Sequence, residues 1–303
     1  MTEPDHTAAA ARPAPTAAHG ELPEISWAFL SHPGAQRPNN EDFVGAYVPS
    51  PDSDEAGLGA LFVLADGMGG HASGEVASRI AVETLVKSWA SSAIGPAHQA
   101  IRSAVRSANA AVFAASLDQA HSGMGTTVVA LTIAGNEVHV GHVGDSRAYL
   151  VRGRQCTQLT SDHSRVAEML RMRLITPEQA ATHPARAQLT RSLGATPSVR
   201  VDVNNSLLER HDSLILCSDG LWDLVSKSEI AALTVKRPAA EAAQTMLDLA
   251  LERGAPDNVT VVVVTVTADL LAAPSAPERS WLPFFRRNRD SREIQVSEDR
   301  GQE

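Results

Sequence analysis

Acidic residues whose side chains could hold metal ions recur where predicted strands end. Four such elements follow apolar runs, and a fifth comes just before one. The elements are Asn40-Glu41-Asp42, Asp66-Gly67, Asp145 in VGDSR, Asp219-Gly220 in CSDGLWD, and Asp257-Asn258. Carboxylates that meet in one place repel each other, and burying them unpaired is costly, so a fold that gathers several normally holds divalent cations between them. The pattern predicts a site for more than one cation.

The spacing and the type of ligand indicate which cation is held. The acidic elements lie tens to more than a hundred residues apart, whereas a calcium-binding loop keeps its ligands within about 12 residues. The sequence has no cluster of cysteine and histidine, and hard oxygen ligands favour Mg2+ or Mn2+ over Zn2+. Two such ions, about 4 Å apart, typically clamp the attacking and leaving oxygens of a phosphate group. The residues therefore indicate phosphate chemistry.

Six motifs, in a fixed order, carry a resemblance to a known family. They are Arg37-x-x-Asn40-Glu41-Asp42, Asp66-Gly67-Met68-Gly69-Gly70-His71, Gly123-Met124-Gly125-Thr126-Thr127, Gly144-Asp145-Ser146-Arg147, Ser218-Asp219-Gly220-Leu221 and Asp257-Asn258-Val259-Thr260. One Asp-Gly pair alone is only a turn signal, but the ordered set is specific. From about Ile25 to Thr267 the sequence resembles the metal-dependent protein Ser/Thr phosphatases of the protein phosphatase 2C type, in their bacterial form. The resemblance implies an α+β fold of two packed antiparallel sheets with helices outside.

The resemblance also implies roles for individual acidic residues. Two core ions of Mn2+ or Mg2+ would be held by Asp66, Gly67 through its carbonyl, Asp219 and Asp257. Glu41 and Asp42 would act from behind these ligands by holding metal-bound waters. Asp145, together with Asp219, would hold a third and weaker ion. Ala187 stands where many members have Asn or Ser, which leaves the affinity of the third ion open.

Arg37 is implied to grip the substrate phosphate, since a planar guanidinium donates two hydrogen bonds at once. A water shared by two cations becomes hydroxide near neutral pH and can attack phosphorus in line with the leaving Ser or Thr oxygen. That leaving alkoxide must be protonated as it departs. Animal relatives carry a His directly after the Asp-Gly pair, where this chain has Met68. His71, three residues further on, and a metal-bound water are the two candidate proton donors.

The composition along the chain indicates one catalytic domain between two tails. Residues 1–24 are rich in Ala, Pro and Thr and predict a disordered leader. Residues 25–267 predict the catalytic domain, with a mobile flap near 164–195. Residues 268–303 predict a disordered tail, whose segment SWLPFFRRNR could instead dock on an anionic membrane or a partner groove.

Net charge, hydrophobicity and cysteine content indicate which ligands and which cellular compartment to expect. The net charge of −9 disfavours a nucleic-acid ligand, and no apolar run approaches the roughly 20 residues of a membrane-spanning helix. The two cysteines, Cys156 and Cys217, predict reduced thiols rather than a disulfide. We therefore expect a cytoplasmic protein, a monomer without a membrane span, that binds phosphorylated proteins.

Hydrophobic periodicity predicts the elements that position these residues. Strands are predicted at 25–31, 43–48, 60–65, 199–208, 213–217 and 258–266. Helices are predicted after Ser73, around 101–112, near 227–234 and near 238–253, with short helical pieces around Thr176. Between them, the β-rich run from Thr126 predicts an antiparallel meander that carries Asp145 in a tight turn between two of its strands.

These observations predict a phosphatase that hydrolyses phosphoserine and phosphothreonine in proteins and opposes a bacterial Ser/Thr kinase. Two alternatives stay open. One is a two-metal phosphodiesterase or small-molecule phosphatase, and the other is a protein that binds phosphoproteins without turnover. The complete set of metal acids argues against the second alternative, since a scaffold has no need to keep them all.

Overall fold

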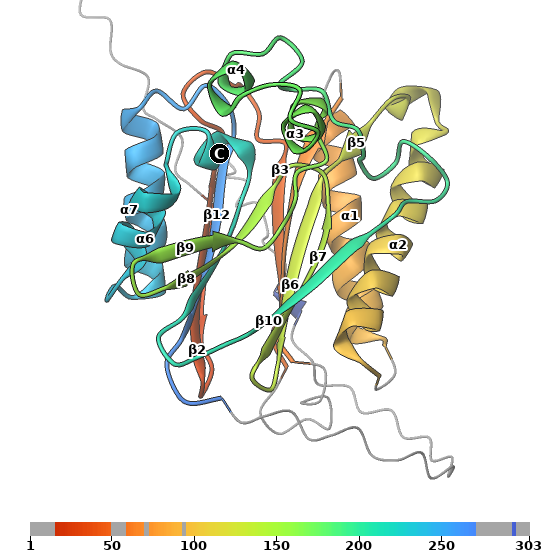
Figure 1. The fold of residues 1–303 in the computed structure, drawn as a ribbon. Helices are drawn as coiled ribbons and strands as arrows, with labels where there is room; N and C mark the ends of the chain where they lie inside the picture. Colours follow the sequence, from red (N-terminus) through yellow and green to blue (C-terminus); the bar gives the residue numbers. More distant parts are fainter. Residues whose placement is uncertain (1–15, 50–58, 70–72, 93–94, 271–292, 295–303) are drawn as a thin grey trace, which may run out of the picture.

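The computed structural model describes residues 16–49, 59–69, 73–92, 95–270 and 293–294. In this part of the chain two antiparallel β-sheets pack face to face, and helices cover both outer faces (Figure 1). The α+β sandwich predicted from the sequence is confirmed.

The first sheet has six strands in the order β1-β2-β12-β11-β8-β9. They are β1 (Thr16–Glu21), β2 (Ile25–His32), β12 (Val259–Val266), β11 (Ser213–Cys217), β8 (Arg147–Arg152) and β9 (Gln155–Gln158). The second sheet has seven strands, ordered β10-β7-β6-β4-β3-β13 with β5 paired to β4. They are β10 (Asp202–Leu207), β7 (Glu137–Val143), β6 (Val128–Ala134), β4 (Leu61–Met68), β3 (Asp42–Tyr47), β13 (Glu293–Ile294) and β5 (Gly125–Thr126).

Two helical layers flank the sheets. The helices are α1 (Ser73–Ala90) and α2 (Ala97–Ser116) on the second sheet, and α6 (Lys227–Thr234) and α7 (Ala239–Glu252) on the first. The described residues also form four short pieces: the 3-10 helix Gln119–His121, α3 (Arg165–Arg171), α4 (Pro177–Ala181) and α5 (Asp219–Trp222). Figure 1 shows α3 and α4 above the end of the sandwich at which β5 lies. These two helices are the short helical pieces predicted for the flap segment.

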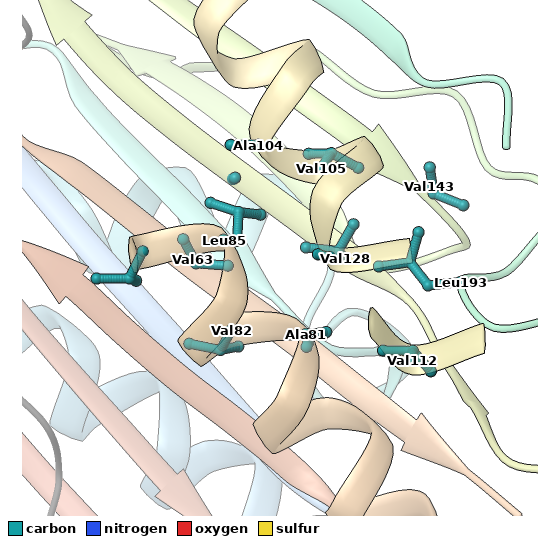
Figure 2. Close-up of a cluster of buried hydrophobic side chains, with 14 of the residues drawn as sticks. Val63, Ala81, Val82, Leu85, Ala104, Val105, Val112, Val128, Val143 and Leu193 are labelled. Carbon is teal, nitrogen blue, oxygen red and sulfur yellow. The ribbon is translucent and has the colours of Figure 1, made fainter. Parts of the chain in front are cut away.

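Apolar side chains form three buried layers. Between the sheets, the ring of Trp27 packs against that of Phe62 with centroids 5.6 Å apart. On the second sheet, the buried residues of α1 include Ala77, Ala81, Leu85 and Trp89, which recur every four residues and therefore share one face. Figure 2 shows part of this layer, in which α1 and α2 meet side chains of the sheet such as Val63 and Val128. A third layer lies between α7 and the first sheet.

Most predicted strands lie where the structure has them. The predicted strands at 25–31, 43–48, 60–65 and 258–266 are β2, β3, β4 and β12. The prediction of a single meander after Thr126 is wrong. β6 and β7 form a hairpin in the second sheet, whereas β8 and β9 form a hairpin in the first, so the turn with Asp145 carries the chain from one sheet to the other. The strands on either side of the Asp145 turn, β7 and β8, are both largely buried and apolar, so periodicity alone does not show that they belong to different sheets.

The prediction that residues 1–24 are a disordered leader is wrong for Thr16–Glu21. This segment forms β1, which pairs with β2 in antiparallel register along six residues. A side chain at Gly20 would approach the Trp27 ring to 2.8 Å, so glycine lets this edge strand lie on the indole. Similarly, Glu293 and Ile294 of the predicted disordered tail pair with β3. Residues 1–15 of the leader and the SWLPFFRRNR segment lie outside the described residues.

Candidate metal and phosphate site

Asp42 and Asp66 face each other across the β3–β4 ladder. Asp42 is the first residue of β3, Asp66 lies near the end of β4, and the antiparallel register makes them direct partners. Like charges directly opposite each other destabilise a sheet. One carboxylate oxygen of Asp42, Oδ1, is buried and has no hydrogen-bond partner in the described structure. An opposed, partly unsatisfied pair of carboxylates needs positive charge to be stable when ionised.

The backbone of Asp66 is fixed by the Gly123–Thr127 motif. The Asp66 N–H donates to Oγ1 of Thr127 at 3.0 Å, and its carbonyl accepts from the Thr126 hydroxyl at 2.8 Å and the Thr127 N–H at 2.9 Å. Gly67 follows, and a side chain there would approach the Gly74 carbonyl to 2.1 Å. Glycine is thus needed where α1 begins against the end of β4.

Asp219 and Asp257 come from neighbouring strands of the first sheet. Asp219 opens α5 directly after β11, and Asp257 precedes β12. A side chain at Gly220 would approach the Asn258 carbonyl to 2.0 Å, so the glycine allows these two chain segments to touch.

Two polar residues join the two sheets at this end of the sandwich. The Ser218 hydroxyl donates to Oδ2 of Asp42 at 2.8 Å. The Asn258 amide donates to the carbonyls of Pro33 and Asn39, and its oxygen accepts from the Glu41 N–H at 2.8 Å. Each motif thus holds the acids of another in place, which explains why the acids can come from distant parts of the sequence.

Asp145 lies in the crossing between the sheets. Its carbonyl accepts from the Trp222 indole at 3.1 Å, and the next hydroxyl, that of Ser146, lies 2.7 Å from Oγ1 of Thr127. Since Thr127 also binds the Asp66 backbone, one hydroxyl links the Asp145 turn to the end of β4. The structure therefore brings Asp145 into the same cluster as Asp66 and Asp219.

The pKa values of these carboxyl groups show how strongly they interact. Burial raises the pKa of Asp42 to about 6 and that of Asp145 to about 6. Burial first, and then neighbouring carboxylates, raise the pKa values of Asp66 and Asp219 well above 3.8. The neighbouring charges that raise the pKa of Asp66 are those of Asp42, Asp219, Asp145 and Asp257. The charges of the other predicted metal carboxylates therefore act on Asp66 through space.

This cluster fits divalent cations. In the described part of the chain no three His, Cys, Asp or Glu side chains stand as a finished ligand set around one point. The unsatisfied Asp42 oxygen, the opposition of Asp42 and Asp66, and the shared rise in pKa nevertheless indicate where positive charge belongs. Asp66, Asp145 and Asp219 keep part of their surface exposed, so ions can reach them. Carboxylate oxygens are the ligands that Mg2+ and Mn2+ prefer.

Arg37 lies next to this cluster and pairs with one of its acids. Its Nη2 donates to Oδ2 of Asp257 at 2.8 Å, and the two side chains are 52% and 38% exposed. The hydrogen bond to Asp257 raises the pKa of Arg37, and the charge of Glu41 acts in the same direction. Arg37 thus stands at the exposed surface of the cluster. His71 lies outside the described residues.

Asp223 belongs to the cluster but was not among the predicted site residues. Its charge raises the pKa values of both Asp145 and Asp219, and burial raises its own pKa. Asp223 also forms an ion pair with Arg186 of the predicted flap. The CSDGLWD motif carries the signal that could have identified Asp223. Asp219 and Asp223 are four residues apart, and residues at this spacing lie on the same side of a helix.

Comparison with known proteins agrees with this geometry. The Protein phosphatase 2C family model matches residues 31–259, which include every acidic residue of this cluster. Protein phosphatase PhpP of Streptococcus pneumoniae is 37% identical over 250 residues, covering 81% of this chain and 98% of that protein. Serine/threonine protein phosphatase PstP of Mycobacterium tuberculosis is 39% identical over 248 residues, covering 80% of this chain and 45% of that protein.

Solved structures share the fold. The crystal structure of M. tuberculosis PstP/Ppp has a TM-score of 0.72 at 38% identity and covers 81% of this chain and 100% of that one. The PstP catalytic domain in complex with 2 manganese ions has a TM-score of 0.70 at 38% identity and covers 81% of this chain and 99% of that one. The chain belongs to the protein phosphatase 2C family.

Proposed function

We propose that this protein is a phosphoprotein phosphatase that depends on Mn2+ or Mg2+ and hydrolyses phosphoserine and phosphothreonine. The observation that carries the proposal is the convergence of carboxylates from both sheets, in which Asp42 opposes Asp66 and is bound by Ser218, next to Asp219. The family match supports the same reaction. The residues that would hold two core cations are Asp66, Gly67, Asp219 and Asp257, with Asp145 at a weaker third one.

The bound cations supply a water of lowered pKa and neutralise the charge of the phosphate group. The other steps belong to side chains. Glu41 and Asp42 hold the ligand cluster from behind, and Arg37 binds the phosphate oxygens with its planar fork. Because the Arg37–Asp257 pair is largely exposed, it is worth about 1 kcal/mol or less. Arg37 can therefore exchange this partner for a phosphate at little cost.

The leaving serine or threonine oxygen needs a proton, and His71 and a water at the cations are the two candidate donors. Replacing His71 by Asn distinguishes them. If His71 is the donor, hydrolysis of a phosphoserine peptide should slow on the order of 100-fold more than that of p-nitrophenyl phosphate, whose phenolate leaves without a proton. Equal loss on both substrates assigns the proton to water.

The substrates we propose are proteins phosphorylated by a bacterial Ser/Thr kinase, on which the enzyme acts as a cytoplasmic monomer. Both cysteines, Cys156 and Cys217, are free thiols, as expected for a reducing compartment. Within the described residues, none of the helices has the length and apolar character needed to cross a membrane.

A direct comparison of substrates tests the proposal. A phosphothreonine peptide and a phosphate diester are assayed in parallel with Mn2+, with EDTA, and with Mn2+ restored after EDTA. We expect peptide hydrolysis that stops in EDTA and returns with Mn2+, and diester hydrolysis at least about 100-fold slower. Faster diester hydrolysis would identify a phosphodiesterase, and peptide binding without turnover would identify a phosphoprotein-binding protein.

A further inference from the structure

A buried histidine outside the carboxylate cluster connects the predicted flap to the turn that carries Asp145. His163 is only 3% exposed and immediately precedes the segment 164–195. Its main chain and its ring make hydrogen bonds in two directions, toward Gly144 on one side and toward the returning end of the flap segment on the other. The mechanism described above assigns no role to this residue.

His163 binds Gly144 twice. The Gly144 N–H donates to Nδ1 of His163 at 3.0 Å, and the His163 N–H donates to the Gly144 carbonyl at 2.8 Å. Gly144 has a φ of +114°, in the region that favours glycine, and a side chain there would approach Cβ of Thr127 to 2.5 Å. The residue directly before Asp145 is therefore held in an unusual conformation, and His163 satisfies both of its backbone groups.

The ring also fixes its own protonation through its second nitrogen. A backbone N–H can only donate, so Nδ1 accepts and the proton of the neutral ring is on Nε2. Nε2 lies 3.0 Å from Oδ2 of Asp202, which accepts that proton in a hydrogen bond. Arg191 also lies 2.9 Å from Nε2, but its Nη1 donates to Oδ1 of Asp202 and the Arg200 carbonyl, because a protonated Nε2 cannot accept.

The same residue anchors both ends of the flap segment. Ser164 continues directly from His163, and the returning strand binds back because the Thr190 N–H donates to the His163 carbonyl at 2.8 Å. Arg191 then reaches Asp202 on β10, which pairs with β7 next to His142. One side chain and its peptide units thus determine where the flap segment begins and ends relative to Asp145.

We propose that His163 is a positioning residue that holds the Gly144–Asp145 turn in the geometry required for cation binding at Asp145. The inference rests on the proposed function only where activity is measured, since cation binding can be followed without turnover. Hydrogen-bonding partners behind metal ligands typically change metal affinity by 10–100-fold when they are removed. An effect of that size is expected at the site that depends on Asp145, and not at the two core sites.

Two substitutions separate the contacts of the ring. His163→Leu keeps the apolar volume but removes the acceptor for the Gly144 N–H, whereas His163→Asn can keep an acceptor at a similar position. His139→Leu is the matched control, because His139, on β7, is also a buried histidine but contacts Glu137 and His98 rather than Gly144. Asp202→Asn weakens the support of Nε2 and serves as the test if His163→Leu does not fold.

The primary measurement is calorimetric titration of the metal-free proteins with Mn2+, with the unfolding temperature in EDTA recorded for each. The site of interest is defined as the one that Asp145→Asn removes from wild type. We expect His163→Leu to weaken that site about tenfold or more while the two tight sites stay within threefold. His163→Asn should restore most of the affinity, Asp202→Asn should weaken it about threefold, and His139→Leu should leave it unchanged.

Activity supplies a second, separate measurement. The Mn2+ concentration for half-maximal phosphatase activity should rise about tenfold in His163→Leu, with kcat at saturating Mn2+ within about threefold of wild type. The proposal would be overturned by equal weakening of every Mn2+ site, by the same loss in His139→Leu, or by wild-type affinity in His163→Leu. It would also be overturned if Asp145→Asn removed no Mn2+ site from the wild-type protein. Wild-type protein that binds Mn2+ but hydrolyses no phosphopeptide would refute the proposed function and leave the positioning role to the titrations.

Discussion

Individual carboxylates decide whether the site can hold cations, because each carries a negative charge that repels the other carboxylates. Asp66, Asp219 and Asp257 are the acids we place directly on the core cations. Asp66→Asn removes one charge from an opposed pair, and the neutral amide has nearly the same shape. Each of the three Asn variants should therefore fold as the wild type does but lose at least about 100-fold in kcat with Mn2+, since ligand loss removes several kcal/mol of transition-state stabilisation.

The matched control for these variants is Asp248→Asn, an exposed aspartate on α7 whose side chain binds Gln244. It should have wild-type kcat and a wild-type unfolding temperature. Activity within twofold of wild type at saturating Mn2+ in any of the three site variants would remove that residue from the ligand set.

Arg37 should act on substrate binding rather than on the chemical step. Because its pair with Asp257 is largely exposed and worth little, Arg37→Ala should not weaken Mn2+ binding. It should raise KM for a phosphopeptide about tenfold and leave kcat within about threefold, since one charge-assisted bidentate contact contributes roughly 1.5–3 kcal/mol. Arg37→Lys should recover only part of the loss, because an ammonium group lacks the planar fork. An unchanged KM in Arg37→Ala contradicts the assignment.

The acids that we place on the core cations were predictable, because each lies in a recognisable motif and is of the residue type that cation binding needs. Asp66, Asp219 and Asp257 each stand at a strand end that periodicity identifies, and the structure brings their charges together. Asp223 was missed because it stands at the end of the short helix α5 rather than at a strand end, so only its spacing of four residues from Asp219 pointed to it. The role of His163 was equally hidden, since its partner Gly144 is 19 residues away and contacts it through the backbone.

At the scale of elements, the long strands of both sheets were easier to predict than the path between the sheets. Long apolar strands such as β4 and β12 have periodicity strong enough to be recognised. β1 has the sequence TAAHGE, with low intrinsic strand preference, and it forms because β2 offers a free edge and Gly20 fits under Trp27. The crossing at Asp145 depends on a glycine conformation, Gly144 at φ +114°, that periodicity does not report.

Truncation tests whether β1 is part of the folded unit. Removing residues 1–15 should leave the unfolding temperature unchanged within about one degree, because the β1–β2 ladder begins at Thr16. Removing residues 1–21 takes away the whole ladder and uncovers Trp27. We expect a loss of about 1–2 kcal/mol, which lowers the unfolding temperature by several degrees in a domain of this size. Equal unfolding temperatures for the two truncations would show that β1 contributes nothing to stability.

For the whole molecule, the carboxylate cluster stores repulsion that the fold maintains for function. Three apolar layers provide the stability that allows several acids to meet at one end of the sandwich. The net charge of −9 adds to this repulsion, and bound cations relieve it. Ligands that bind only the folded state stabilise it by mass action, so removing the cations should lower the free energy of unfolding.

The pH dependence of the metal-free protein should reveal this stored repulsion. The pKa of Asp42 rises to about 6 in the folded protein, against about 3.9 in the unfolded chain. A carboxyl group with a raised folded pKa stabilises the fold below the unfolded pKa, and that stabilisation is lost as pH rises through the folded pKa. In EDTA, Asp42→Asn should therefore be more stable than wild type at pH 7.5, by on the order of 2 kcal/mol, and equally stable at pH 3.5. Urea unfolding of both proteins at several pH values measures this difference in stability, and subtracting one protein from the other cancels the contribution of the other titrating groups.

With saturating Mn2+ at pH 7.5 the order of stability should reverse, because the wild-type carboxylate then faces positive charge. A difference in stability that does not change between pH 3.5 and 7.5 would show that Asp42 is not held in an opposed, desolvated pair.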